Sequence, residues 1–228
     1  DKGVPLPVMH QGGGRLNLAR ALRAKVAASP VSVSFGAGTR NVNVTRPVLI
    51  TNVGIYPDTF SLTANPAGAG PVPSITPATV QLSAGQSAVV TARLSGTAPG
   101  PGEYQGYIHI QGTRPDSQIH LAYWYGVPDG ALAHLIVDRP SEDGAAGKQH
   151  EEPIVIFLLD KYGIPAPNVV PKVEEIGGGG TVVKLEAGDG NYPGQYLLWF
   201  KLGPQPDTLS GFRISAGPFS EDVWLWGR

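Results

Sequence analysis

The sequence contains no cysteine among its 228 residues. It therefore offers neither a disulfide framework nor a thiolate metal site, and cysteine usage gives no information about its compartment. No apolar run approaches the roughly 20 residues that a membrane-spanning helix needs, so we expect no membrane span. The opening Asp1-Lys2 is followed by no apolar core of a signal peptide. We interpret the sequence as an internal or C-terminal fragment of a longer protein.

Charge of either sign is scarce and balanced. The 17 basic and 18 acidic residues leave a net charge of -1, which gives no electrostatic reason to expect nucleic acid or an anionic membrane as a partner. Glycine and proline are abundant, at 31 and 22 residues, while 41% of the chain is hydrophobic. That combination indicates many turns around real cores. The length suits two modest domains better than one large β domain.

Short segments of alternating polar and apolar residues fill the chain after residue 30. In the first half they predict strands near 31–35, 46–52, 58–63, 78–82, 87–95, 103–111 and 118–127. In the second half they predict strands near 132–138, 153–159, 169–175, 181–186, 195–202, 209–215 and 221–226. Seven strands in about a hundred residues are typical of an immunoglobulin-like or fibronectin-type sandwich. We therefore predict an all-β fold, with two such β-sandwiches in tandem after a short N-terminal helical segment.

The helical segment is indicated by apolar residues at helical spacing. Leu18, Ala21, Leu22 and Val26 would share one face, Asn17 could cap the start, and Pro30 would end the helix. The ordinary interpretation is an amphipathic helix that packs on its neighbour.

The stretch from Gly12 to Leu22 (GGGRLNLARAL) resembles the end of the catalytic domain of secreted subtilisin-like serine proteases. There a glycine-rich turn opens the last helix before accessory β domains begin. The resemblance implies a remnant of the preceding catalytic domain at 1–29, and accessory domains at 30–128 and 129–228.

Each accessory region carries its own resemblance. The first resembles the fibronectin-III-like domains behind bacterial subtilase catalytic domains, on Arg46–Gly54, Leu82–Ser87 and Gly102–Tyr104. The second is similar to bacterial Ig-like domains of the invasin and intimin type, on Leu159–Pro165, Gly177–Gly180 and Pro193–Tyr196. We transfer only the fold from the second resemblance, and no receptor binding.

Catalytic motifs are missing. A subtilisin-like protease needs an Asp-[Ser/Thr]-Gly, a His-Gly-[Thr/Ser]-His and a Gly-Thr-Ser-Met-Ala, and none occurs in the sequence. The glycine stretches at 12–14 and 177–180 lack the residues of a phosphate-binding or dinucleotide-binding loop. We therefore expect no catalysis by this chain and no cofactor.

One four-residue pattern recurs. Pro-Gly-Glu-Tyr ends at Tyr104 and Pro-Gly-Gln-Tyr ends at Tyr196, 92 residues later, which is one sandwich-sized period. We predict that both tyrosines are corner residues whose hydroxyls tie a turn to the backbone.

The hairpin of strands 103–111 and 118–127 supplies the candidate site. Matching its apolar faces sets Ile108 opposite Leu121 and therefore His109 opposite His120 on the outer face. The candidate binding residues on that face are Tyr107, His109, His120 and Trp124, with Gln105 beside them. Packing against the helix or the second domain is the favoured interpretation, and a ligand or partner surface is the alternative. Two histidines without a third ligand make an incomplete metal site, so we expect no metal there.

Two further groups of residues have competing interpretations. Trp224 and Trp226 would share one face of the last strand, where core or inter-domain packing is favoured over carbohydrate stacking. The acidic residues of two turns could offer oxygens to calcium but lack a loop-site spacing, so solvated carboxylates are favoured. These acidic residues are Asp138, Glu142 and Asp143 in one turn, and Glu186 and Asp189 in the other.

The expected function is that of a non-catalytic C-terminal region of a subtilisin-like serine endopeptidase. It would stabilise or space the protease domain and hold a protein substrate or a cell-surface glycan near it, in a secreted or surface-bound bacterial protein. The alternatives are a cell-surface adhesion module, with the Tyr107 to Trp124 face as its binding surface, and a carbohydrate-binding module.

Overall fold

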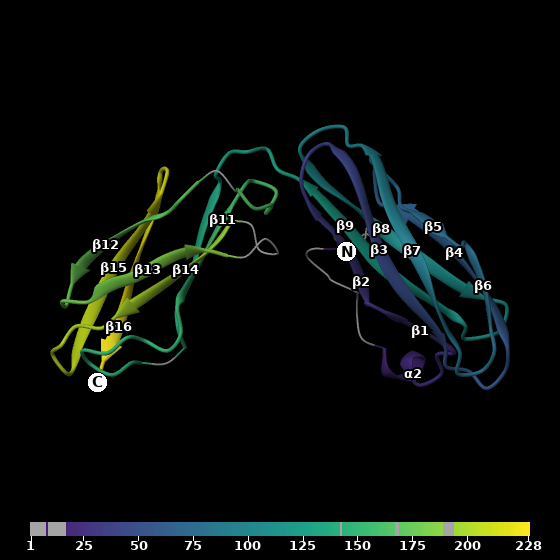
Figure 1. The fold of residues 1–228 in the computed structure, drawn as a ribbon, viewed down its shortest axis with the longest axis horizontal. Helices are drawn as coiled ribbons and strands as arrows, with labels where there is room; N and C mark the ends of the chain where they lie inside the picture. The colour runs from purple at the N-terminus through teal and green to yellow at the C-terminus, as the bar shows by residue number, and fades with distance from the viewer. Residues whose placement is uncertain (1–7, 9–16, 142, 167–168, 189–193) are drawn as a thin grey trace. The chain divides into compact units, whose positions relative to one another are not determined.

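A computed structural model of the chain describes residues 8, 17–141, 143–166, 169–188 and 194–228. The chain divides into two compact units, Asp1–Val127 and Pro128–Arg228 (Figure 1). Strands dominate both units. The part of the chain that the structure describes has no helix long and apolar enough to cross a membrane.

The first unit is built from two sheets. One has the strand order β1-β3-β7-β5 and the other has the order β2-β9-β8-β4-β6. Neighbouring strands are antiparallel except for β2 and β9, which pair in parallel. The strands are β1 (Val26–Ser29), β2 (Ser32–Ala37), β3 (Asn41–Asn52), β4 (Asp58–Pro66), β5 (Ser74–Thr76), β6 (Thr79–Leu82), β7 (Ser87–Thr97), β8 (Gly102–Gly112) and β9 (Gln118–Val127).

The second unit also has two sheets, both antiparallel. Their strand orders are β10-β11-β14-β13 and β12-β15-β16. The strands are β10 (His134–Asp138), β11 (Ile154–Leu159), β12 (Lys172–Gly177), β13 (Thr181–Ala187), β14 (Gln195–Lys201), β15 (Thr208–Ala216) and β16 (Phe219–Gly227).

These strand orders are those of the immunoglobulin fold. If the strands of the second unit are lettered A to G along the chain, its sheets read A-B-E-D and C-F-G, as in a seven-stranded immunoglobulin domain. The first unit has the same two sheets, with β2 and β6 added at the edges of the second one. The predicted all-β fold with two tandem sandwiches is therefore confirmed.

Alternation along the strands produces the two cores. In β8, Tyr104, Gly106, Ile108 and Ile110 are buried, while the residues that alternate with them face outward and are half-buried or exposed. Each unit has its own cluster of buried apolar side chains, one drawn from β1 to β9 and the other from β11 to β16. Each sandwich therefore has the core of an independent domain.

The predicted strands are confirmed. The structure has two further strands that were not predicted, β1 and β5, and its helix is shorter than expected. The α-helix α2 spans only Leu18–Ala21, and Val26 belongs to strand β1, which pairs with β3. Val26 is 2% exposed, because its side chain is buried in the core of the sandwich and not on the face of a helix. The expected boundary at residue 29 is therefore too late, because Val26–Ser29 already belongs to the first sandwich. The three-residue strand β5 (Ser74–Thr76) was also not expected.

The recurring Pro-Gly-x-Tyr pattern does not mark equivalent positions. Tyr104 begins β8, the F strand, and its hydroxyl donates to the carbonyl of Gly100 at 2.6 Å, which is a tyrosine corner. Tyr196 begins β14, the E strand, and donates instead to the carbonyl of Val169, 27 residues upstream, at 2.8 Å. The corner prediction is thus confirmed for Tyr104. For Tyr196 the hydroxyl does bond to a backbone carbonyl, as predicted, but the corner position is wrong.

A buried carboxylate holds the start of the second unit. Asp160 is fully buried and accepts hydrogen bonds from the backbone amides of Asp129, Tyr162 and Ile164, at 2.8 to 2.9 Å. Lys161 forms an ion pair with Asp129 at 3.3 Å. The first residues of the second unit are therefore held to it at Asp129.

Candidate functional site

The hairpin of β8 and β9 has the register that the sequence predicts. His109 lies opposite His120, and Ile108 lies opposite Leu121. On the outer face the rings of Tyr107 and His120 meet edge to face, with centroids 5.0 Å apart, and the two imidazoles are 6.1 Å apart. The structure thus brings Tyr107, His109 and His120 into one aromatic cluster.

Trp124 lies on the same face, further along β9, opposite Gln105. Its indole Nε1 donates a hydrogen bond of 3.0 Å to the carboxylate of Glu103 on β8. Trp124 is half-buried, and this bond fixes the orientation of its ring. The four candidate residues therefore share one sheet face, as a ring cluster and a separate Trp–Glu pair.

Part of this face is covered by the chain itself. The backbone amide of Val8 donates a 2.6 Å hydrogen bond to the side-chain oxygen of Gln105, in the middle of the face. Ala122 points to the same side as His120 and Trp124, yet it is only 1% exposed. The face is therefore partly covered near its centre.

Metal ligands are not gathered in the part of the chain that the structure describes, where no group of three or more His, Asp or Glu side chains is close enough to hold an ion. Among the acidic turn residues, Asp143 pairs with Arg228 at 2.6 Å. Glu142 and Asp189 lie outside the described residues, and Asp138 is exposed on β10.

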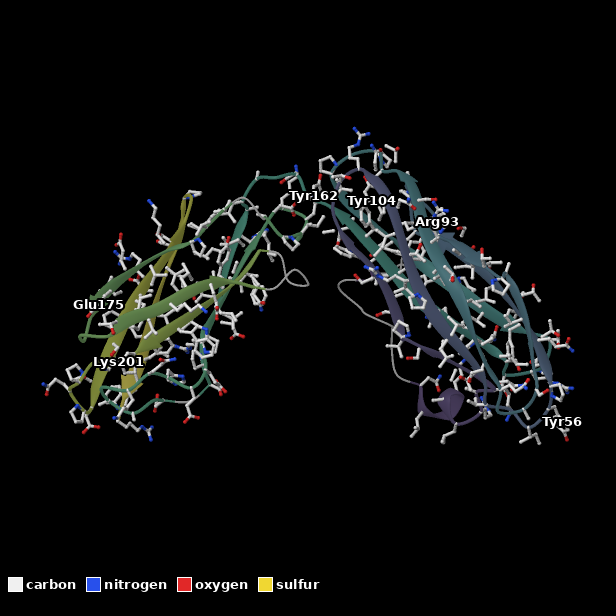
Figure 2. The ribbon with its side chains drawn as sticks, viewed as in Figure 1. Tyr56, Arg93, Tyr104, Tyr162, Glu175 and Lys201 are labelled. Atoms are coloured by element: carbon white, nitrogen blue, oxygen red, sulfur yellow. The ribbon has the colours of Figure 1, made fainter. Side chains whose placement is uncertain are left out.

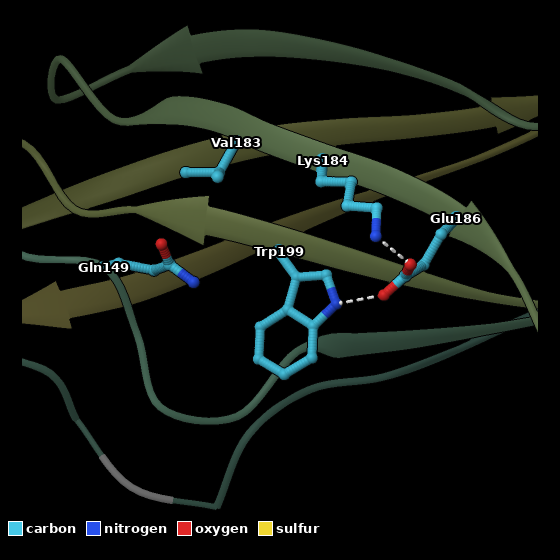
Figure 3. Close-up of a pocket in the computed structure, with 5 residues that line it drawn as sticks. All are labelled: Gln149, Val183, Lys184, Glu186 and Trp199. Atoms are coloured by element: carbon cyan, nitrogen blue, oxygen red, sulfur yellow. Dashed lines mark hydrogen bonds and ion pairs between the residues drawn. The ribbon is translucent and has the colours of Figure 1, made fainter.

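An open pocket of about 260 Å³ lies on the second unit, over β13 and β14 (Figure 3). The indole of Trp199 donates to Glu186 at 2.8 Å, and Lys184 forms an ion pair with the same carboxylate. The bond from Lys184, followed by that from Trp199, lowers the pKa of Glu186. Gln149 and Val183 complete the lining. Since the carboxylate is already occupied by two donors, the pocket offers a ligand few unsatisfied polar atoms.

Trp224 and Trp226 are not core residues, so the core part of the favoured interpretation is wrong, and the inter-domain part stays a prediction. They point outward from β16 and are 42% and 39% exposed. The inner face of this strand is formed by Val223 and Leu225, which are buried. Because successive residues of a strand point to opposite faces, the inward direction of Val223 and Leu225 turns both tryptophans outward.

One end of the first unit exposes apolar residues that the sequence patterns do not predict. Five large apolar residues are exposed there, at the end of the unit that carries α2; these residues, here called the apolar end, are Leu18, Leu22, Val53, Ile55 and Tyr56. The amides of Val53 and Gly54 donate to the carbonyl of Lys25 at 3.0 and 3.2 Å, which holds the loop beside the segment after α2. Figure 2 shows Tyr56 at the end of the unit opposite Tyr104. The sequence signal for this surface was the presence of three apolar residues in the short loop 53–56.

Comparison with known proteins gives the fold neighbours and nothing more specific. No protein-family model and no curated protein sequence matches the chain. A Porphyromonas gingivalis protein of unknown function is 13% identical over 88% of this chain and 98% of its own, with a TM-score of 0.41. The chaperone–tip adhesion subunit complex CsuC–CsuE of Acinetobacter baumannii is 11% identical, over 90% and 100% of the two chains, with a TM-score of 0.38.

A third similar structure is the SafA pilin with the SafB chaperone from Salmonella enterica. It is 13% identical over 89% of this chain and 96% of its own, with a TM-score of 0.38. At these scores the likeness extends to β-sandwich domains of the immunoglobulin type and supports no conclusion about activity or partners.

Proposed function

We propose that this chain is the non-catalytic accessory region of a secreted bacterial subtilisin-like serine endopeptidase, and that it stabilises or spaces the catalytic domain. The observation that carries the proposal is the exposure of Leu18 and Leu22, at 66% and 79%. An amphipathic helix normally buries its apolar side, yet all four residues of α2 are exposed. A domain preceding the sandwiches would cover that side.

The loop beside α2 supports the same interpretation. Ile55 and Tyr56 are 77% and 57% exposed, and together with Leu18 and Leu22 they enlarge the apolar end. The guanidinium of Arg114 lies over the Tyr56 ring at 5.1 Å from its centroid, which holds the loop side chain in place. Large exposed apolar patches on soluble proteins usually mark interaction sites. The identity of the covering domain rests on the resemblance of Gly12–Leu22 to the end of a subtilase catalytic domain.

The test compares two double variants in two contexts. Leu22→Gln with Ile55→Gln changes the apolar end, and Val31→Gln with Val89→Gln changes residues of similar exposure elsewhere, at 78% and 60%. In the isolated chain each double variant should shift the free energy of unfolding by less than about 1 kcal/mol, because the side chains are exposed. In the full gene product only the apolar-end variant should accelerate thermal inactivation of peptidase activity.

Two results would separate the parts of this proposal. If the full gene product has no peptidase activity on casein or small peptides, the proposal that the chain belongs to a subtilisin-like protease is wrong. If the product is active but both double variants inactivate at the wild-type rate, the catalytic domain does not pack on the apolar end. A truncated product for comparison should end at Ala24, because Val26–Ser29 belongs to the first sandwich.

A second candidate function is adhesion through the Tyr107, His109, His120 and Trp124 face. The edge-to-face contact of Tyr107 with His120 favours it, because a pre-ordered aromatic cluster binds a partner at low entropic cost. His109→Gln with His120→Gln should weaken attachment of the chain to bacterial or host cells without unfolding it. Unchanged attachment in that variant removes this candidate.

A further inference from the structure

An indole packs on glycine backbone at the outer face of the second unit. Trp224 of β16 stands opposite Gly211 of β15, which in turn stands opposite Gly177 of β12. A side-chain carbon placed on Gly211 would come within 2.5 Å of the Trp224 ring, and one on Gly177 would come within 3.3 Å. The six-membered ring therefore rests on the backbone of β15 and reaches β12.

This position leaves one face of the ring available. The inner face of the Trp224 ring is turned toward glycine backbone, while the side chain as a whole is 42% exposed. The exposed part of the indole is therefore its side away from this backbone. Two glycines in register under one tryptophan produce a flat aromatic surface that any larger residue would tilt.

A second exposed tryptophan continues the surface. Trp226 is two residues further along β16, roughly 7 Å away along the strand, and it faces Leu209 of β15. Trp226 and Leu209 are 39% and 41% exposed. Covering a glycine explains the position of Trp224, but it does not explain why a second indole is exposed beside it.

Polar groups border Trp224 on the other side. Arg213 makes two hydrogen bonds to the carboxylate of Asp222, at 2.7 and 2.8 Å, and Glu174 stands opposite Arg213 on β12. This row presents both donors and acceptors at the edge of the indole. It contains two carboxylates and one guanidinium, so it has no excess positive charge to attract phosphate or an acidic polymer.

We propose that the outer face of β12, β15 and β16 binds a neutral glycan chain, with one pyranose ring stacked on Trp224 and the next one near Trp226. The C–H face of a pyranose is apolar and fits a flat indole, while its hydroxyls fit the Arg213–Asp222 row. This inference does not depend on the proposed protease parent, because the second unit would bind the glycan in any longer protein.

The test measures binding of the whole chain to defined polysaccharides by affinity electrophoresis. The neutral probes are mixed-linkage β-glucan, xylan, galactomannan and glycogen, and the anionic comparisons are polygalacturonate and dextran sulfate. At least one neutral polymer should retard the chain. Trp224→Ala should weaken that binding tenfold or more, and Trp226→Ala should weaken it less.

Two further variants separate stacking from a merely structural role. Gly211→Ala keeps both tryptophans but lifts the Trp224 ring, so it should also weaken binding, while Trp224→Phe should retain part of it. Trp199→Phe, on the other sheet of the second unit, is the matched control and should bind as the wild type does. Circular dichroism and the fluorescence of the remaining tryptophans verify that each variant is folded.

The proposal is overturned if no neutral polymer retards the chain, or if only the anionic polymers do. It is also overturned if folded Trp224→Phe and Gly211→Ala variants bind a neutral polymer as tightly as the wild type.

Discussion

Two tyrosines of the first unit hold their hydroxyls in opposite environments. The Tyr104 hydroxyl donates to the Gly100 carbonyl and accepts from the Gly100 amide, at 2.6 and 3.0 Å. The Tyr123 hydroxyl is buried, and within the described part of the chain it has no hydrogen-bond partner. Burial raises the pKa of Tyr123 to about 12, since the charged form would lack solvation.

The same substitution should therefore have opposite effects at these two positions. Tyr104→Phe should lower the free energy of unfolding by about 1 kcal/mol, because it removes a satisfied hydrogen bond. Tyr123→Phe should leave it unchanged or raise it by about 1 kcal/mol, because it removes a hydroxyl that is desolvated without compensation. Urea unfolding of the two variants against the wild type measures both effects, and a destabilised Tyr123→Phe would contradict the assignment.

Asp58 makes the stability of the first unit depend on acidity. Burial alone would raise the pKa of this carboxyl, but hydrogen bonds from the Thr113 hydroxyl and from the Thr113 and Thr59 amides outweigh burial and lower it from 3.8 to about 2. A depressed pKa in the folded state stabilises the fold above the ordinary pKa, and this stability is lost as the pH falls through the folded value.

Asp58→Asn should consequently remove about 2 kcal/mol of stability at pH 6, and the difference from the wild type should disappear near pH 2. Urea unfolding between pH 6 and pH 2, followed by hydrogen exchange of β8 and β9, measures this difference. Asp138→Asn, an exposed carboxylate of the second unit, is the control and should leave the first unit's transition unchanged. A difference that stays constant with pH would contradict the ionised state of Asp58.

At the scale of elements, the alternation of polar and apolar residues predicted the strands. Errors arose where pairing with a strand distant in sequence determined the secondary structure. The segment VAAS of β1 has the composition of a helix end, but its pairing with Leu49–Asn52 of β3 makes it a strand. The Pro-Gly-x-Tyr pattern specifies a turn that enters a strand. It does not specify which strand of the sandwich follows, so Tyr104 and Tyr196 occupy the F and E strands.

The same distinction separates the surfaces that the sequence could predict from those it could not. The ring cluster at His109 and His120 was predictable because both residues belong to one hairpin, whose register follows from its own apolar residues. The outward direction of Trp224 was not, because Val223 and Trp224 are both apolar and alternation alone does not say which one faces the core. The apolar end joins residues about 30 positions apart in sequence, which no local pattern relates.

At the scale of the whole molecule, the two separate cores predict two unfolding transitions. Ile50 belongs to the core of the first unit and Ile156 to the core of the second, and both are fully buried. Replacing a buried isoleucine with alanine costs about 2–5 kcal/mol. For domains of about 100 residues, a loss of that size lowers the transition midpoint by roughly 10–20 °C.

Ile50→Ala should therefore lower the midpoint of one calorimetric transition and leave the other in place, and Ile156→Ala should do the reverse. Hydrogen exchange assigns each transition, since β8 amides report on the first unit and β14 amides on the second. Wild-type transitions that overlap would still separate in either variant, because only one of them moves. If each variant instead shifts a single transition that includes amides of both units, the two sandwiches unfold as one cooperative body.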